Sequence, residues 1–382
     1  MFKKKSILFV NPDYHCSFIL RDEFRKMGWR ADVCINFNYP EKLLYKNEGL
    51  SLLNFNRIKN KWIRKVLIRF VWVLYPLFAL FRFKYFLFYG TMDVFSLGAT
   101  AFLKRFLGED FRLFLSLAKL LGKKMLYLPS GCRHEELQST IAKLDNGNVC
   151  NNCGVPACED RLLIQHFRVH RRYGDFFFGS STLNSTQFPQ THIKYKSLDL
   201  SLWHPDIEVP KEFLLPPTKN LRIMHSFFEG GRTANRKNIK GSPFVLKAIK
   251  RLKRKGYSVE YYYVQDVPSK YMRYYQVQAD IIVEQLIYGW WGSTGIETMA
   301  LGKPVVCYLR PAWKEFFLKT FPEYESLPVV EATTETIYHV LKRLVVDKEY
   351  HKQKGKEARI FAERHFDAKK NAVELEKLFL SL

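Results

Sequence analysis

Residues 292–306 read GSTGIETMALGKPVV, a glycine-containing loop that leads into an expected helix over 295–301 and then into an apolar strand over 304–308. The first N–H groups of a helix have no intrahelical partner and lie at its positive end, which suits a phosphate. Glu297, placed in the first turn, can accept hydrogen bonds from two sugar hydroxyls. The residues whose amides would face the anion are Gly292, Ser293 and Thr294.

Strand-like apolar runs and helical patterns alternate on both sides of this stretch. In the first half, a strand at 5–11 is followed by a helix-compatible segment and a second strand at 30–35, and a similar order recurs around 124–128. Strands that alternate with helices predict a parallel sheet covered by helices. Because 382 residues exceed one ordinary core, we expect an α/β protein with two Rossmann-like domains facing a cleft.

The boundary between the two halves follows from a group of prolines at 205, 210, 216 and 217. Proline interrupts both helix and sheet hydrogen bonding, so we place the linker there. The alternation of strands and helices restarts at 221 and continues to an amphipathic pattern at the end of the chain. The expected parts are a first domain over 1–205, a linker over 206–219, a second domain over 220–365 and a C-terminal helix over 366–382.

The loop and helix of residues 292–306 resemble the donor-site signature of group-1 glycosyltransferases with the GT-B fold, which reads roughly G-x-x-x-x-E-A-M-A-x-G-x-P-V-V. The matching residues are Gly292, Glu297, Met299, Ala300, Gly302, Pro304, Val305 and Val306. The resemblance implies a nucleotide-sugar donor whose ribose is held by Glu297, and a helix over 366–382 that packs back on the first domain. Where the family commonly has a second glutamate that contacts the sugar, this chain has Gly289.

A second part of the resemblance lies upstream, where a strand ending near His225 is followed by basic residues and then by Lys240 and Gly241. In the family an arginine and a lysine-glycine pair grip the pyrophosphate, because a departing nucleoside diphosphate develops negative charge that fixed cations stabilise. The alternative is a basic loop that is only solvated. The donor-binding candidates, in order of preference, are Lys240, Arg236 and Arg232, with His225 beside them. We expect no divalent-metal requirement for catalysis.

Groups that could act as acid or base in the first half lie in loops that follow strands, where open α/β sheets place their ligands. The candidates are Asp13, His15, His134 and Glu135. Each can transfer a proton, although a capping or surface role is the more common use of any single such residue. Two routes stay open, namely retention through the donor's own phosphate, which the resemblance favours, and inversion through one of these groups.

Four cysteines fall in an insert over 132–158, most of them in the polar, turn-rich stretch DNGNVCNNCGVPACED at 145–160. Thiolates separated by two to four residues suit tetrahedral zinc, which would anchor a loop that has little core of its own. The candidate ligands are Cys132, Cys150, Cys153 and Cys158, and His134 could replace one thiolate. The alternatives to this structural zinc site are reduced loop cysteines or a redox pair.

The segment over 57–84 is basic and aromatic and has no acidic residue, in a chain whose formal net charge is +24. Interleaved rings and cations suit the headgroup region of an anionic membrane surface. Because Arg69, Pro76 and Arg82 interrupt the apolar run, we expect docking at the interface and not a span. The alternative is a basic helix that packs its apolar side on the first domain.

These features together predict an enzyme that transfers a sugar from a nucleotide-sugar donor to a cell-envelope polysaccharide or lipid-linked glycan acceptor. The lack of a signal-peptide pattern and the odd number of cysteines, seven, favour a cytoplasmic protein that is peripheral on the inner face of the membrane. A sugar-nucleotide 2-epimerase on the same fold is an alternative. A nucleic-acid-binding protein would explain the charge but not the Glu297 motif, so we expect no nucleic-acid partner. The oligomeric state does not follow from the sequence.

Overall fold

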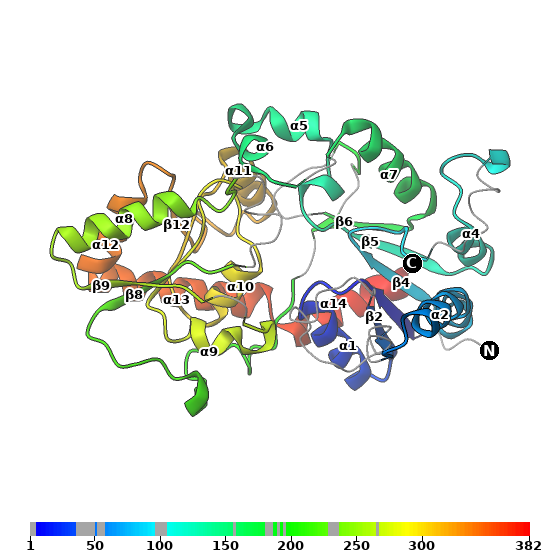
Figure 1. Ribbon diagram of the computed structural model, residues 1–382, viewed down its shortest axis with the longest axis horizontal. Coiled ribbons are helices and arrows are strands. Elements are labelled where there is room, and N and C mark those ends of the chain that lie inside the picture. Colours follow the sequence, from blue (N-terminus) through cyan, green and yellow to red (C-terminus); the bar gives the residue numbers. More distant parts are fainter. Residues whose placement is uncertain are drawn as a thin grey trace.

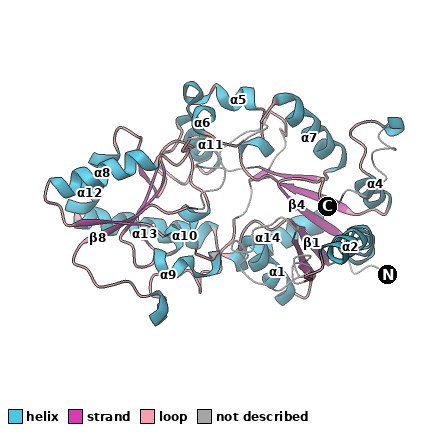
Figure 2. Cartoon of the chain, in the orientation of Figure 1, coloured by secondary structure: helices cyan, strands magenta, loops and turns pink. Residues whose placement is uncertain are grey.

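The computed structural model contains two parallel β-sheets, each covered by helices on both faces and lying side by side along the long axis of the molecule (Figures 1 and 2). Every pair of strands in the described part of the chain is parallel. The residues that the structure describes are 5–35, 50–51, 58–95, 105–155, 158–179, 186–188, 192–193, 196–227, 237–264 and 267–382.

The first half of the chain forms a seven-stranded sheet with the order β3-β2-β1-β4-β5-β6-β7. Its strands are β1 (Ser6–Val10), β2 (Arg30–Ile35), β3 (Leu50–Ser51), β4 (Tyr85–Tyr89), β5 (Lys124–Leu128), β6 (Phe176–Gly179) and β7 (His192–Ile193). Its helices are α1 (Cys16–Lys26), α2 (Lys61–Arg82), α4 (Leu113–Leu120), α5 (Gln138–Ala142), α6 (Asn148–Asn152) and α7 (Asp160–Tyr173), with 3₁₀ turns η3 (Cys132–His134) and η4 (Leu144–Gly147). The strand order reverses between β1 and β4, which marks the point where doubly wound sheets place a ligand.

The second half forms a five-stranded sheet with the order β12-β11-β10-β8-β9. Its strands are β8 (Leu221–Met224), β9 (Val259–Tyr262), β10 (Ile281–Gln285), β11 (Val305–Cys307) and β12 (Val330–Glu331). Its helices are α8 (Ser242–Arg254), α9 (Met272–Gln276), α10 (Ser293–Ala300), α11 (Pro311–Thr320), α12 (Ile337–Val346), α13 (Lys348–His365) and α14 (Ala368–Ser381), with 3₁₀ turns η5 (Lys211–Phe213) and η8 (Ser269–Tyr271). Here the strand order reverses between β8 and β10, so the second sheet also has a point where doubly wound sheets place a ligand.

The central strands are buried on both faces, as expected where helices cover both sides of a parallel sheet. All five residues of β1, with the sequence SILFV, are buried, and so are all five of β10. The last two residues of β10 are Glu284 and Gln285, which are polar. A buried carboxylate at the carboxyl end of a central strand is costly unless it has partners, so this end of β10 indicates a site.

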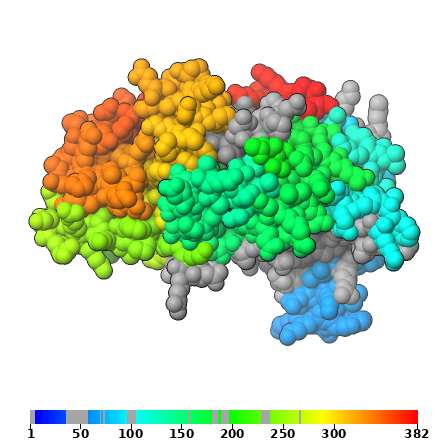
Figure 3. All heavy atoms as spheres, turned by 90° about the horizontal axis from the view of Figure 1, so that it is seen from above, coloured from blue at the N-terminus to red at the C-terminus, as the bar shows by residue number. Residues whose placement is uncertain are grey.

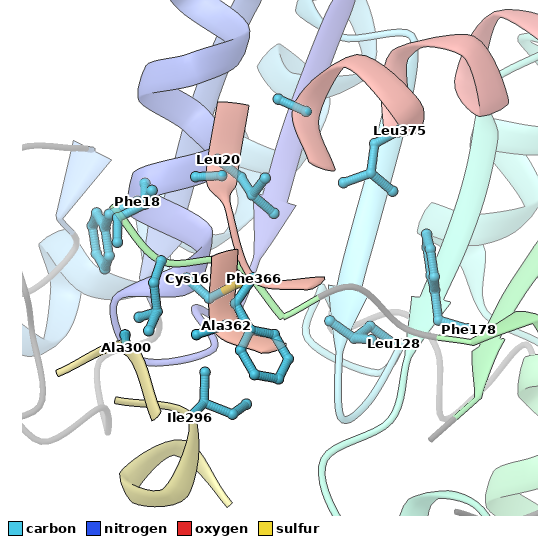
Figure 4. Packing of buried hydrophobic residues seen from close by; sticks show 14 of the residues in the cluster. Cys16, Phe18, Leu20, Leu128, Phe178, Ile296, Ala300, Ala362, Phe366 and Leu375 are labelled. Carbon is cyan, nitrogen blue, oxygen red and sulfur yellow. The ribbon is translucent and has the colours of Figure 1, made fainter. Parts of the chain in front are cut away.

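One apolar core is shared by the two halves of the chain. Figure 4 shows Cys16 of the first half close to Ile296, Ala300 and Phe366, which come from the second. On the far face of the first sheet, a second core lies under α2, α4 and α7, and a third lies between the second sheet and the helices α8 and α12. Burial of apolar surface stabilises the shared core by roughly 25 cal/mol per Å², so the two halves are held together near the start of α1.

The chain returns to the first half at its end, where α14 packs against α1 (Figure 1). The rings of Phe24 and Phe379 stack at 5.7 Å, and the Trp29 indole N–H donates to Glu376 Oε1 at 2.6 Å. The Asp367 side chain caps the start of α14 by accepting from two backbone N–H groups. Between the two sheets, the described part of residues 206–219 has one short 3₁₀ turn, η5, as its regular structure.

The helix α2 stands out from the body of the molecule. It runs over 22 residues and continues through Pro76, and in the space-filling view its blue residues project to one side (Figure 3). Its start is fixed by Asn60, whose side-chain oxygen accepts from the backbone N–H groups of Trp62 at 3.0 Å and Ile63 at 3.2 Å. This cap satisfies two of the N–H groups that have no partner within the helix at its start, although much of the helix surface is exposed.

Candidate active site

A cavity of about 900 Å³ lies between the two halves, and both contribute to its wall. The second half contributes the loops after β8 and β10 and the start of α10, and the first half contributes the loops after β1 and β5, the end of β4 and the cysteine-rich insert. Such a volume is within the range of about 300 to 1,000 Å³ that small-ligand sites occupy. The loops that form it follow the strands at which both sheets reverse their order.

Lys240 lies at the base of this cavity, in the loop that follows β8. Its ammonium donates to Glu284 Oε1 at 2.5 Å, and both side chains are almost fully buried. A buried ammonium beside one carboxylate presents its remaining N–H groups to the cavity, which suits an anionic oxygen. Glu284 was not among the residues predicted from the sequence, although its place at the carboxyl end of β10 is the signal that could have indicated it.

The loop before α8 is held by its own side chains. Asn238 Oδ1 accepts from the backbone N–H groups of Lys240 at 3.1 Å and Gly241 at 3.0 Å. Gly241 has a φ of +77°, a conformation that favours glycine, and it approaches β10 closely, because a Cβ here would lie 3.0 Å from Leu286. This geometry fixes the direction in which the Lys240 side chain enters the cavity.

His225 has a different place from the one predicted. It is fully buried below the cavity and does not line it, and its ring nitrogens contact Val283 O and Ser242 Oγ, each at 2.8 Å. Burial lowers its pKa to about 4, so the ring is neutral at pH 7. His225 therefore ties β8 to β10 and α8 and supports this part of the cavity wall. The predicted Arg232 and Arg236 lie outside the described residues.

Glu297 points into the cavity from α10. Its Oε2 accepts from the Gln276 side-chain amide at 2.6 Å, and its Oε1 lies 3.6 Å from His15 Nδ1 of the first half. Burial, together with a smaller contribution from the charge of nearby Glu284, raises the pKa of Glu297 to about 8, although the hydrogen bond from Gln276 opposes the shift. The carboxyl group is thus poised to titrate near neutral pH and lies where the two halves meet.

The helix α10 begins earlier than predicted. Ser293 is its first residue, so Glu297 lies in the second turn and not in the first, which corrects the sequence-based placement. Ser293 and Thr294 take helical conformation directly after Gly292, and all three line the cavity. The first N–H groups of α10 consequently lie at the cavity wall, as an anion site requires.

Glycines near α10 leave room for larger groups. A Cβ on Gly295 would lie 2.7 Å from Trp291, whose ring stacks on Trp290 at 4.1 Å and helps to line the cavity. Gly289 has a φ of +96° and packs on Arg310, whose Cβ would lie 2.9 Å away from a Cβ at this position. A side chain at Gly289 would therefore be strained.

On the first-half side, Asp13 and His15 lie in the loop after β1 and are both buried. The Asp13 carboxylate forms an ion pair with Lys196, so it is already committed to a neighbouring charge. The His15 ring packs on Trp203 at 4.8 Å, and burial lowers its pKa to about 4. Neither residue lines the large cavity; both line a small adjoining pocket that also includes Ser293.

His134 and Glu135 follow β5, and their side chains have different surroundings. His134 is directed to the backbone, with Nδ1 2.8 Å from Ser130 O, and it does not line the cavity. Glu135 is buried and lines the cavity. Of the four acid or base candidates, Glu135 is thus the one whose side chain borders the large cavity.

The four predicted zinc ligands come together in the insert. Cys132, Cys153 and Cys158 line the cavity. Burial, together with smaller contributions from the nearby thiols of Cys153, Cys158 and Cys150, raises the pKa of Cys132 to about 12, so the four sulfurs lie within electrostatic range. Over the described residues, which omit 156–157, no three or more His, Cys, Asp or Glu side chains are arranged to hold a metal ion. Zinc therefore stays a prediction, which metal analysis of the purified chain tests.

The same insert reaches across to the second half (Figure 1). Asp145, in the turn between α5 and α6, accepts from Arg310 Nε at 2.9 Å and from the Tyr308 hydroxyl at 3.1 Å through the same oxygen. Arg310 is almost fully buried, and its guanidinium also lies over the Trp313 ring at 4.1 Å. Nothing in the sequence indicated this contact, because its partners are 165 positions apart. We call it the Asp145 clasp.

Comparison with solved structures places this geometry in a known architecture. HepE from Anabaena, solved with UDP and glucose, is similar over 98% of this chain and 99% of its own, with a TM-score of 0.56 and 13% identity. Sucrose-phosphate synthase from Thermosynechococcus elongatus covers 99% and 98%, with a TM-score of 0.56 and 12% identity. A UDP-GlcNAc 2-epimerase from Neisseria meningitidis, bound to UDP-GlcNAc, covers 99% of each chain, with a TM-score of 0.54 and 11% identity.

Two facing Rossmann-like domains, a cleft between them and a last helix that returns to the first domain define the class: this chain has the GT-B fold. The expected α/β architecture is confirmed. No protein-family model matches the sequence, and no curated protein is similar to it in sequence. At 11 to 13% identity the structural likeness defines the fold alone.

Proposed function

We propose that this chain is a nucleotide-sugar-dependent glycosyltransferase. The observation that carries the proposal is the convergence of three groups on one cavity, namely the Lys240 ammonium, the N-terminus of α10 and the Glu297 carboxyl group. A cation and free amides suit a diphosphate, and a carboxylate suits the two hydroxyls of a ribose. HepE, which shares the fold, was solved with UDP and glucose.

In the proposed reaction, the bond from the anomeric carbon of the donor sugar to its phosphate breaks, and a bond to an acceptor hydroxyl oxygen forms. The negative charge that develops on the departing diphosphate is stabilised by Lys240 and by the amides of Ser293 and Thr294. The acceptor proton passes either to a phosphate oxygen of the donor, which gives retention, or to Glu135, which gives inversion. The Asp145 clasp holds the two halves closed over the donor and so excludes water.

The transferred group in this proposal is a hexosyl or related sugar, and the acceptor is a polysaccharide or lipid-linked glycan of the cell envelope. The acceptor would approach from the first half, past Glu135 and the cysteine-rich insert, since these border the cavity opposite Lys240. Cytoplasmic donors and membrane-linked acceptors meet at the inner face of a membrane, which is where we propose that the enzyme acts.

A nucleotide screen tests the donor site directly. The melting temperature of the purified chain is measured with UDP, GDP, ADP, CMP and dTDP, and repeated with Lys240→Ala and Glu297→Ala. A ligand that binds only the folded state raises the melting temperature, by an amount that grows with its concentration relative to Kd. We expect a rise with one nucleotide that both variants lose and that the surface variant Lys250→Ala keeps. No rise with any nucleotide would contradict the proposal.

A sugar-nucleotide 2-epimerase is the second candidate, because Glu135, Glu284 and Glu297 all line the cavity and an epimerase needs proton-transferring groups around the sugar ring. The two functions separate in an assay without acceptor. An epimerase converts its nucleotide sugar into the epimer, which proton NMR follows, whereas a glycosyltransferase leaves it intact apart from slow hydrolysis. We expect no epimer from UDP-GlcNAc after prolonged incubation.

A further inference from the structure

The helix α2 carries apolar side chains that the protein itself does not cover. Its packed side, which includes Tyr75, Ala79 and Leu80, lies in the second half of the helix. Over residues 61–70, no side chain that the structure describes is buried, and Trp62 and Phe70 are 73% and 61% exposed. Figure 3 shows these blue residues projecting from the body. The first three turns thus extend beyond the domain they belong to.

The exposed apolar side chains form one stripe along α2. They are Ile63, Val66, Leu67, Phe70, Leu74, Phe78 and Phe81. Spacings of three and four residues place side chains on the same face of a helix, so this stripe runs the length of α2 and faces away from the packed side. Soluble proteins rarely leave such a continuous apolar surface open to water, because burying these side chains would be stabilising. We call it the α2 stripe.

The charges on the same helix all have one sign. Lys61, Arg64, Lys65, Arg69 and Arg82 are its ionisable side chains apart from Tyr75, and it has no acidic residue. Two copies of this chain that met through α2 would bring these cations together, in molecules of net charge +24, and like charges repel. An anionic bilayer accepts both features, because rings and aliphatic groups enter the headgroup region while Lys and Arg reach lipid phosphates.

No helix among the described residues is long and apolar enough to cross a membrane. We propose that α2 is a docking helix that lies in the surface of an anionic bilayer, with the α2 stripe inserted and its lysines and arginines on the lipid headgroups. Because no described side chain over residues 61–70 is buried, this insertion requires no rearrangement of the described fold. The proposal does not depend on the identity of the nucleotide or on catalysis.

Flotation with vesicles of defined composition tests the proposal. The full-length chain is mixed, without nucleotide, with vesicles of phosphatidylcholine alone or with about 30 mol% phosphatidylglycerol. We expect at least about tenfold more bound protein on the anionic vesicles, and a large loss when NaCl is raised from ~0.1 M to ~0.5 M. Equal binding to both kinds of vesicle, or no binding to either, would overturn the proposal.

Two sets of variants distinguish vesicle binding through the α2 stripe from binding through other exposed apolar groups or through net charge. Ile63→Gln/Val66→Gln/Phe70→Gln removes exposed apolar groups that belong to no core, and Val346→Gln/Ile360→Gln/Val373→Gln removes exposed apolar groups elsewhere. We expect the first triple variant to lose about tenfold or more of its vesicle binding and the second to keep it. Both should retain the wild-type melting temperature, since none of these side chains is in a core.

Charge reversal provides the second set. Lys61→Glu/Arg64→Glu/Lys65→Glu on α2 is compared with Lys348→Glu/Lys352→Glu/Lys356→Glu on the exposed side of α13, so that net charge changes equally. Vesicle binding should fall only in the α2 variant. Equal losses would mean that total charge alone drives binding, and would contradict a docking helix. A wild-type dimer in light scattering that the glutamine variant of α2 converts to monomer, without any vesicle binding, would assign the stripe to a second copy instead.

Discussion

On the second-half side of the cavity, the ligand contacts predicted from the sequence lie in two local segments, the loop before α8 and the helix α10, whereas the acid or base candidates of the first half come from loops far apart in the sequence. Lys240 and Glu297 were predicted as ligand contacts and both line the cavity. Of the four acid or base candidates opposite, only Glu135 does. Contacts that come from one short segment can be predicted from the sequence, because the spacing of residues along a loop and helix determines which side chains lie together.

The largest effect should follow from removing the cation of the donor wall. Lys240→Ala deletes the buried ammonium and should lower turnover by about 10²- to 10³-fold, the range measured when one fixed stabilising donor is lost. Nucleotide binding, measured by calorimetry, should weaken with it. The variant also leaves Glu284 buried without its cation, so Lys240→Ala/Glu284→Gln serves as a second variant that removes both charges.

If the double variant folds with a wild-type melting temperature and still binds nucleotide as tightly as the wild type, Lys240 does not contact phosphate. Lys250→Ala, on the exposed side of α8, is the matched control and should change neither property. Such a result would remove Lys240 from the predicted ligand contacts of the second half.

The clasp between the two walls should give the next largest effect. Asp145→Asn leaves the Arg310 guanidinium buried without a charged partner, which costs about 3 kcal/mol when the charge stays buried and less when the halves open to solvate it. We expect a loss of about 2 kcal/mol in the unfolding free energy or, if the halves open, a rise of about 2 kcal/mol in the transition-state barrier. Denaturant unfolding and kcat/KM measure the two.

Asp206→Asn, at a highly exposed carboxylate beside His204, is the control for charge and should be neutral. Tyr308→Phe removes only the second contact to Asp145 and should have an effect of about 1 kcal/mol or less. If Asp145→Asn behaves like Asp206→Asn, the clasp does not hold the walls together.

A pH profile of nucleotide binding sharpens the role of Glu297. Its pKa is raised to about 8 by burial, so at pH 7 the free protein carries mostly the protonated form. A ribose whose two hydroxyls donate to the group favours the carboxylate, so binding should release a proton. The nucleotide Kd should therefore fall about tenfold between pH 7 and pH 9. In Glu297→Gln the affinity should be weaker at pH 9 and independent of pH.

The same pKa shift has a stability consequence of known sign. Because the pKa of Glu297 is higher in the folded chain than its ordinary value, the protonated group's contribution is fully present below about pH 4.5 and is lost as pH rises through about 8. Melting curves of the wild type should therefore decline, relative to Glu297→Gln, between these values. A constant difference from pH 5 to pH 9 would show that the carboxyl group titrates as if exposed.

The sequence predicted the two-domain α/β architecture and the two segments that line the cavity around Lys240 and Glu297, because both depend on local patterns, namely apolar runs, glycine before a helix, and Lys-Gly before α8. It could not predict the clasp, because Asp145 and Arg310 meet only through the fold, nor that His225 would be turned into the protein to support β8 and α8. In both cases the sequence does not show which side chains the fold buries. The same holds for the exposed stripe of α2. The rings and cations of this segment are compatible both with a helix that packs its apolar side on the domain and with one that leaves an apolar side exposed.

The smallest effect is expected at Glu135, and it decides how far the first-half wall takes part in chemistry. If the donor's own phosphate accepts the acceptor proton, Glu135→Gln retains the size of the side chain and should raise the acceptor KM only about threefold, a change of under 1 kcal/mol, with kcat nearly unchanged. His134→Gln, which does not border the cavity, should be neutral. A loss of kcat of about 10²-fold or more in Glu135→Gln, with its acidic pH limb removed, would instead make this carboxylate the base of an inverting reaction. The first-half wall would then carry the chemistry, and the donor wall would serve binding alone.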